Sequence, residues 1–316
     1  MKNSRPGKNQ IHEILDKNFM YVMIDFYGMQ TEFMSSIIKE FKDIDKGYII
    51  FFILSKLFKK INVTEKNYND FKIKNNHLLI KDFKIIDLVD EMSVPKETIR
   101  RKIEELINDN FIKYDNKNIY INFNKDETIN ILKGHIKMSS KFISRFFFFY
   151  NSIKYTGTEY NNKNIEDKIF KNFEFNFNLF INFQVDYYKI WKNTMKDFNV
   201  ILIYLLCLLN NLYIIKKKNP EKSKVNFNKS IITQFKHHER RGLNATSIAE
   251  LSGIPRATVI RKLNLLLSNN LIIKDKNLLY TIKLDNNNFY HKTFKKKVPK
   301  VMDIISTFLF TSYKNF

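Results

Sequence analysis

The chain has 316 residues and a formal net charge of +22, with 54 Lys and Arg against 32 Asp and Glu. That length allows two domains with proper cores, the charge favours a polyanionic partner, and the single cysteine excludes a disulfide framework within the chain. The composition is rich in Lys, Asn, Ile and Phe, as AT-rich coding would make it, so part of the lysine surplus reflects codon bias.

The N-terminal part of the chain predicts an arm, helices and a connector. Residues 1–10 are polar and basic and are expected to form a flexible arm. The stretch Ile11–Phe41 indicates one or two helices, and Tyr48–Lys60 indicates a strongly apolar helix that Gly47 precedes. Residues 61–80 are rich in Asn and Lys and indicate a connector with room for one short strand.

Two stretches, residues 86–121 and 246–282, share one pattern. In the second, the apolar period predicts a short helix at Ser247–Ser252 and a longer one at Pro255–Asn270. A β-ribbon then joins Leu271–Lys274 to Leu278–Ile282. Gly253 stands where the turn between the helices needs a positive φ, and Pro255 suits a first helical position. The pattern predicts a helix-turn-helix followed by a β-wing.

The same device is expected in the first stretch, because the two align without a gap when Pro95 is placed on Pro255. Two copies in register are much less probable by chance than one motif match. The aligned stretches are identical at Pro95/Pro255, Thr98/Thr258, Arg101/Arg261, Lys102/Lys262, Leu106/Leu266, Asn110/Asn270, Ile112/Ile272, Asp115/Asp275 and Tyr120/Tyr280.

Each copy resembles the winged-helix domains of bacterial transcription regulators of the MarR and IclR types. The likeness is confined to the motif in each copy and rests on Ile248-Ala249-Glu250, residues 253–259 (GIPRATV) and Arg261-Lys262-Leu263, with their counterparts in residues 88–103. The first copy has Ser93 where the family usually has glycine, and Val89 in place of alanine, so its turn is expected to be tighter or slightly distorted. The resemblance implies a DNA-binding fold.

The rest of the chain predicts a second pass through the same elements. A long helix is expected at Thr128–Tyr155, ending in the aromatic run 146–150, and a polar linker at 156–179. An apolar helix is predicted at Val200–Ile215, and a Lys/Asn-rich connector over 216–241. The closing helix is expected at Val298–Tyr313, with Pro299 in its first turn.

The predicted fold is therefore mainly α with small β-wings, in two winged-helix domains that arose by internal duplication. One repeat covers residues 11–155 and the other 180–316, related by a pseudo-two-fold axis as in a fused dimer. The Phe-rich terminal helices either join the halves or fill the core of their own half. In a fused dimer the recognition helices should sit about 34 Å apart on one face.

Arginine is the better guide to function under the codon bias, because only eight of the 54 basic residues are Arg. Four of the eight lie in the predicted recognition helices and two more just before the second motif, where a guanidinium can meet guanine or phosphate. We predict Arg101 and Arg261 as the first choice for base contacts and Lys102 and Lys262 for phosphate contacts. The full predicted DNA-binding set is Lys96, Thr98, Arg100, Arg101, Lys102, Lys113, Lys117, Arg240, Arg241, Arg256, Thr258, Ile260, Arg261, Lys262, Asn264, Lys274 and Lys276. Neither wing contains glycine, and Asn116 and Asn277 at the wing tips are expected to take the left-handed turn conformation instead.

Nothing in the sequence argues for catalysis, a metal or a cofactor, since one Cys and six scattered His make no zinc spacing and no phosphate-binding loop occurs. The hypothesis is a cytoplasmic, sequence-specific regulator of transcription that binds duplex DNA as a single-chain pseudo-dimer and not a membrane. The sequence leaves open whether RNA polymerase or a small effector is a further partner. The alternatives are a plasmid-type replication initiator with two winged helices, and a winged-helix scaffold that binds protein.

Overall fold

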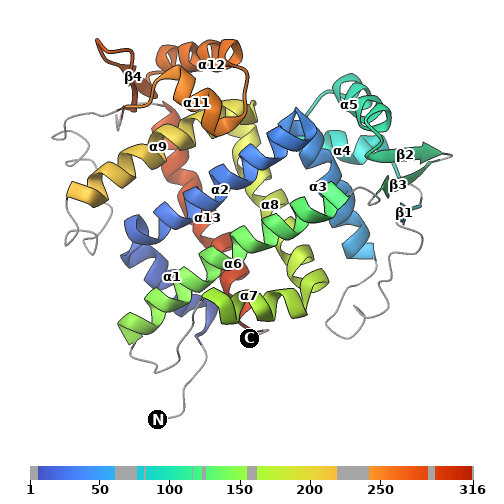
Figure 1. Cartoon of the computed structure of the whole chain (residues 1–316), viewed down its shortest axis with the longest axis horizontal. Coiled ribbons are helices and arrows are strands. Elements are labelled where there is room, and N and C mark those ends of the chain that lie inside the picture. Colours follow the sequence, from blue (N-terminus) through green and yellow to red (C-terminus); the bar gives the residue numbers. More distant parts are fainter. Residues whose placement is uncertain are drawn as a thin grey trace.

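The computed structural model describes residues 6–60, 77–81, 83–115, 117–122, 126–154, 162–218, 242–283 and 289–314. This part of the chain is mainly helical and carries two small antiparallel sheets (Figure 1). The predicted mainly-α class with small β-elements is confirmed at this level. The predicted connector at 216–241 lies almost wholly outside the described residues.

The first half runs from α1 to α6. Helices α1 (Lys8–Lys17), α2 (Phe19–Phe41) and α3 (Ile44–Lys60) lead to strand β1 (His77–Ile80). Helices α4 (Ile85–Met92) and α5 (Lys96–Asn108) follow, then strands β2 (Ile112–Asp115) and β3 (Asn118–Asn122), and the half closes with α6 (Asp126–Lys154). The sheet has the order β1-β3-β2, with Ile112 opposite Ile121. We call residues 77–122 the first helix–hairpin unit.

The second half follows the same order. Helices α7 (Asn162–Lys171), α8 (Phe173–Met195) and α9 (Phe198–Lys218) precede α11 (Ala245–Ser252) and α12 (Arg256–Ser268). Strands β4 (Ile272–Lys274) and β5 (Tyr280–Ile282) form a hairpin, and α13 (Phe289–Lys314) closes the half. Leu243 bridges Tyr280, so a short piece of chain also lies beside β5. Residues 242–283 are the second helix–hairpin unit.

Corresponding helices of the halves agree in length and in partners. Helices α1 and α7 have 10 residues each, and α2 and α8 have 23 each. Helix α2 packs against α9, while its counterpart α8 packs against α3; α1 packs against α13, while α7 packs against α6. All four of these contacts cross from one half to the other, although α7 also follows α6 directly in the chain. The halves therefore interlock in one helical body instead of standing side by side.

Large aromatic side chains fill the centre of this body. The apolar residues of α2 recur every three or four positions, which gives the helix a continuous buried face. Across the halves, the ring centroids of Phe33 and Phe180 lie 5.3 Å apart, those of Phe26 and Tyr187 5.6 Å, and those of Tyr48 and Tyr188 4.2 Å. Such pairs add favourable edge contacts to the burial of their area. The cross-half interface is thus a true hydrophobic core.

The aromatic run at the end of α6 both fills the core and contacts the closing helix of the other half. Phe146 and Phe147 are buried, and the Phe147 ring lies 4.7 Å from that of Tyr313 in α13, a contact between the two closing helices. Phe148 is 69% exposed and belongs to neither core. The run therefore contributes to the junction between the halves, but not with all of its rings.

Several predicted boundaries are corrected. The linker expected at 156–179 is helical from Asn162, because Ile165 and Ile169 of α7 are buried at helical spacing against α6. Helix α1 begins at Lys8, inside the arm expected at 1–10, and Gly47 lies within α3 instead of before it. Helix α13 begins at Phe289, well before Val298, so Pro299 is inside the helix and not in its first turn.

Left-handed backbone ends the short helix of each unit. Gly253 has φ +74°, as the sequence predicted, and Ser93 adopts the same region at φ 53°. The turn at Ser93 therefore keeps the left-handed conformation that Gly253 adopts, although a side chain in this conformation costs about 1–2 kcal/mol relative to glycine. Asn110 and Asn270 are also left-handed, at φ 60° and 55°, each two residues after the end of α5 or α12. This position prefers Gly or Asn, which explains the identity of the two residues.

Helix α9 is, among the described residues, the one long and apolar enough to cross a bilayer, over Phe198–Lys217. Within that stretch 67% is buried inside the fold, as in the core helix of a soluble protein. Cys207 lies in this helix as a free buried thiol, and burial raises its pKa to about 12. It is therefore a core side chain and not a reactive nucleophile.

Candidate nucleic-acid interface

Helices α5 and α12 each present one face to the core and one to solvent. Ile99, Ile103 and Leu106 are buried residues of α5, and Val259, Leu263 and Leu266 hold the same positions in α12. Pro95 and Pro255 cap the two helices from the position before the first helical residue, a shift of one from the prediction for Pro255. Figure 1 places both helix–hairpin units on the same side of the helical body, away from α1 and α7.

The arginines of α5 are exposed but share their helix with acids. Arg100 lies 3.5 Å from Glu97, and Arg101 lies 3.2 Å from Glu105. Lys96 is exposed as well, and Thr98 is partly buried. Because these ion pairs are solvent-exposed, each is worth little in stability, yet they lower the net positive charge that α5 offers to an anion.

Helix α12 contains no acidic residue within Arg256–Ser268. Arg261 and Asn264 are exposed, and Thr258 and Ile260 are partly buried. Arg256 is exposed, and its Nε donates a hydrogen bond to Thr246 Oγ1 at 3.2 Å, which fixes the guanidinium at the start of the helix. The outward face of α12 is therefore more positive than that of α5.

Lys102 and Lys262 do not face outward, which corrects their predicted role in phosphate contact. The Lys102 side chain is 7% exposed, and its Nζ lies 2.5 Å from Asp43 Oδ2. Lys262 occupies the matching position and forms the same ion pair with Asp197. Asp43 follows α2 and Asp197 follows α8, in the junctions with α3 and α9. Each lysine therefore ties its outward helix to the interlocked body instead of extending into solvent.

Asp43 carries the electrostatic mark of this tether. Burial by itself raises the pKa of the Asp43 carboxyl, but the hydrogen bond and positive charge of Lys102 outweigh it and leave the pKa below the ordinary aspartate value. Backbone N–H groups of Asp45 and Lys46 also stabilise the carboxylate. The sequence could not single out Asp43 or Asp197, because each lies far along the chain from its lysine partner.

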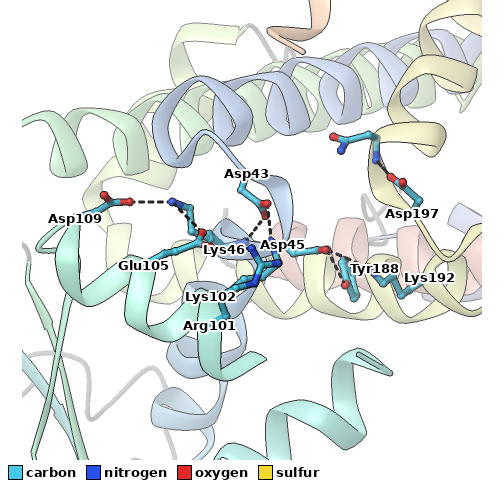
Figure 2. A network of polar contacts seen from close by, with 11 residues as sticks. Asp43, Asp45, Lys46, Arg101, Lys102, Glu105, Asp109, Tyr188, Lys192 and Asp197 are labelled. Carbon is cyan, nitrogen blue, oxygen red and sulfur yellow. Dashed lines mark hydrogen bonds and ion pairs between the residues drawn. The ribbon is translucent and has the colours of Figure 1, made fainter. Parts of the chain in front are cut away.

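The first unit has a second set of ion pairs whose counterparts do not occur among the described residues of the second unit (Figure 2). Lys46 Nζ lies 2.8 Å from Asp109 and 3.8 Å from Glu105, at the end of α5. Asp45 accepts hydrogen bonds from Lys192 at 3.0 Å and from Tyr188 at 3.2 Å, both in α8. When Asp43 is aligned with Asp197, the residues that match Asp45 and Lys46 are Asn199 and Val200. These two side chains carry no charge and cannot form ion pairs. The first unit is thus held more firmly.

The hairpins present basic side chains, although their turns differ from the prediction. Lys113, Lys117 and Lys276 are exposed, and Lys274 is exposed with its Nζ 5.8 Å from the Tyr280 ring centre. The left-handed residue of the second turn is Leu278, at φ 61°, and not Asn277. Asp275 explains the shift, because its Oδ1 accepts from the backbone N–H groups of residues 277 and 279. Asn116, Arg240 and Arg241 lie outside the described residues.

Other chemistry-bearing side chains belong to the core. His135 is buried on α6, its Nε2 lies 2.8 Å from Ser36 Oγ, and burial lowers its pKa to about 3. The imidazole is therefore neutral at physiological pH. Within the described ranges no three His, Cys, Asp or Glu side chains come together in a way that could hold a metal ion.

Comparison of the chain with protein-family models, with curated proteins and with solved structures finds no match. The arrangement of residues in the two units is thus the main guide to what the protein does.

We predict that Lys102→Met lowers the free energy of unfolding by about 1–3 kcal/mol, because it leaves a partly buried carboxylate without its donor. Urea denaturation at pH 7 measures this loss, with the exposed Lys113→Met as a control that should change stability by less than about 0.5 kcal/mol. Lys102→Met combined with Asp43→Asn should lose less than the sum of the single losses. Strict additivity would contradict the tether.

The Lys102–Asp43 ion pair also influences how the free energy of unfolding falls at acid pH. Since the folded pKa of Asp43 lies below its unfolded value of about 3.9, the pair contributes fully above that pH and is lost as pH falls through the folded pKa. The stability of wild type should therefore drop more steeply below about pH 4 than that of Lys102→Met. Parallel curves would show that Asp43 titrates independently of Lys102.

Proposed function

We propose that the protein binds duplex DNA sequence-specifically and regulates transcription, with two winged helices in one chain acting as a pseudo-dimer. The observation that carries this proposal is the placement of two similarly built helix–hairpin units on one side of a shared helical body. In each unit the second helix has a buried inner face and an exposed outer face that starts with a basic residue, Lys96 or Arg256. A helix so mounted can enter the major groove with its first turns.

Internal duplication accounts best for the two halves. Nine identical positions in register, the same order of elements, and matched contacts across the halves all support it. A pseudo-two-fold axis that exchanges α2 with α8 and α3 with α9 would convert the contact of α2 with α9 into that of α8 with α3. Duplex DNA has a near two-fold symmetry of its own, which a fused dimer matches with two half-sites.

The charge distribution favours DNA over a protein partner. The net charge of +22 would attract a polyanion, and release of counterions would then supply affinity. Exposed arginines occur in both outward helices, and exposed lysines in both hairpins. The two units also expose large apolar side chains, so it is the charge, and not a lack of apolar surface, that favours DNA. These exposed apolar residues are Ile86, Ile107, Tyr114, Leu251, Leu265 and Leu278.

The two halves are proposed to contribute unequally. Glu97 and Glu105 pair with the arginines of α5, whereas Arg261 of α12 has no acid on its own helix. Carboxylates near phosphates are repelled, so the second unit should supply more of the affinity. The ion pair of Lys46 with Asp109 then orients the first unit on the helical body more than it adds attraction to DNA.

A selection of bound sequences from a random duplex pool, at one stated salt concentration, tests the proposal. We predict an enriched site with two half-sites whose centres lie about 10–10.5 base pairs apart, since the units share one side of the body. Enrichment of long arrays of repeats would favour a replication initiator. A pool without enrichment, bound weakly and uniformly, would contradict sequence-specific recognition.

We predict that Arg261→Ala costs about 1–3 kcal/mol of binding and relaxes specificity at one position. Arg101→Ala should cost less, because Glu105 already engages its guanidinium. Titrations of both variants on the selected duplex, at the same salt concentration, compare the two losses, and unchanged thermal unfolding controls for folding. Equal losses, or a larger loss at Arg101, would refute the unequal contribution of the halves.

A further inference from the structure

The start of α13 carries a cluster of lysines that the two helix–hairpin units do not include. Four of them are exposed, and the helix has no acidic residue before Asp303. We call this set the α13 lysine run: Lys292, Lys295, Lys296 and Lys300. No residue of the run was among those that the sequence motifs singled out.

Helical geometry places the run on one face. At about 100° per residue, its four members fall within an arc of about 140°, and Phe294 lies on the opposite side. The Phe294 ring packs 5.3 Å from that of Trp191 in α8 and 5.4 Å from that of Tyr204 in α9. The run therefore faces away from the helical body.

Positive charge is crowded here. Lys297, on the edge of the run, donates from its Nζ to the carbonyl of Ile190. Its pKa is lowered, first by burial and then by the charge of Lys300. An anion beside these side chains would relieve that repulsion.

The run lies next to the second helix–hairpin unit. Strand β5 ends at Ile282 and α13 begins at Phe289, and the short connection between them spans at most about 25 Å. Helix α9, which packs on Phe294 through Tyr204, also packs against α12 and β5. In Figure 1, α13 descends from beneath this unit toward the opposite end of the molecule.

The first half has no lysines at the positions that match the α13 lysine run. At the offset that aligns Pro95 with Pro255, the corresponding positions in α6 are Leu132, His135, Ile136 and Ser140. Lysines of α6 occur at other positions, and one of them, Lys137, lies 3.9 Å from Glu166 of α7. Helix α6 also begins with Asp126 and Glu127. Helix α6 carries Lys133, Lys137, Lys141 and Arg145 at four-residue spacing and has no acid after Glu127. Two of these side chains already form ion pairs with acids of other helices, Lys137 with Glu166 and Arg145 with Asp25, so the basic stripe of α6 is partly neutralised.

We propose that the α13 lysine run is a third DNA contact, which binds backbone phosphates flanking the half-site of the second unit. This inference rests on the proposed function and deepens it: the run reads no bases, adds affinity, and gives the bound chain a polarity along the duplex. Lysine suits this role as a flexible point charge.

The test compares two triple variants on duplexes of different length. Lys292→Gln, Lys296→Gln and Lys300→Gln together remove a stripe of the run. Lys163→Gln, Lys168→Gln and Lys171→Gln remove three exposed lysines from α7, at the opposite end of the body. Binding is titrated across a series of salt concentrations on the selected site with minimal flanks, and with about one extra helical turn of duplex on one side or the other. Thermal unfolding verifies that both variants are folded.

Wild type should gain affinity from extra flank on the second unit's side only. The α13 variant should lose that gain, and its salt slope on the long duplex should be shallower by about 2–3, one phosphate contact per lysine. The α7 variant should match wild type. Equal behaviour of the two variants, or loss by the α13 variant on the short duplex alone, would overturn the inference.

Binding to phosphatidylserine vesicles, lost in the α13 variant while the flank effect persists, would also overturn it and assign the run to a membrane surface. Failure of wild type to bind the short duplex would instead refute the proposed function itself. The two failures are therefore distinguishable within one set of titrations.

Discussion

The interlocking of helices across the halves is the constraint on which the rest of the structure depends. Helices α2 and α3 bury their apolar faces against α8 and α9, and pairs such as Tyr48 with Tyr188 fill the space between them. Separation of the halves would expose these apolar faces and buried rings to water, which is unfavourable, so neither half is expected to stand alone. The relative placement of the two helix–hairpin units is therefore fixed by the core and not by a linker.

The ion pairs extend this constraint to the outward helices. Lys102 and Lys262 join α5 and α12 to the aspartates that follow α2 and α8, so any rotation of the core helices would reach both units. Lys46 and Asp45 add a link from the first unit to α8 of the other half. Removing one partner of such a pair is costly, whereas replacing both by apolar side chains is often nearly neutral, so the main effect of the pair here is to hold one geometry. The two halves thus have the same order of helices but unequal sets of ion pairs.

Sequence reasoning predicted what depends on local pattern. Proline, glycine and the helical period located both helix–hairpin units to within a few residues, and the burial of the α5 and α12 inner faces followed from the same period. Pairing between residues far apart in the chain could not be predicted from local pattern. The position of Lys102 on its helix suggests an exposed phosphate contact, but in the fold its ammonium pairs with Asp43. The polar composition of residues 156–179 predicts a linker, although Ile165 and Ile169 have the spacing of a buried helical face. The identity of Asn110 and Asn270 was visible, but its left-handed cause was not.

Hydroxyl-radical footprinting of the chain on its selected duplex, at one protein per duplex, tests the central claim most directly. If the interlocked body holds both outward helices toward one DNA face, a single chain should protect two windows on that face, their centres about one helical turn apart. Protection should be stronger in the window of the second unit. A single protected window at equimolar protein, or two windows on opposite faces of the duplex, would contradict the account.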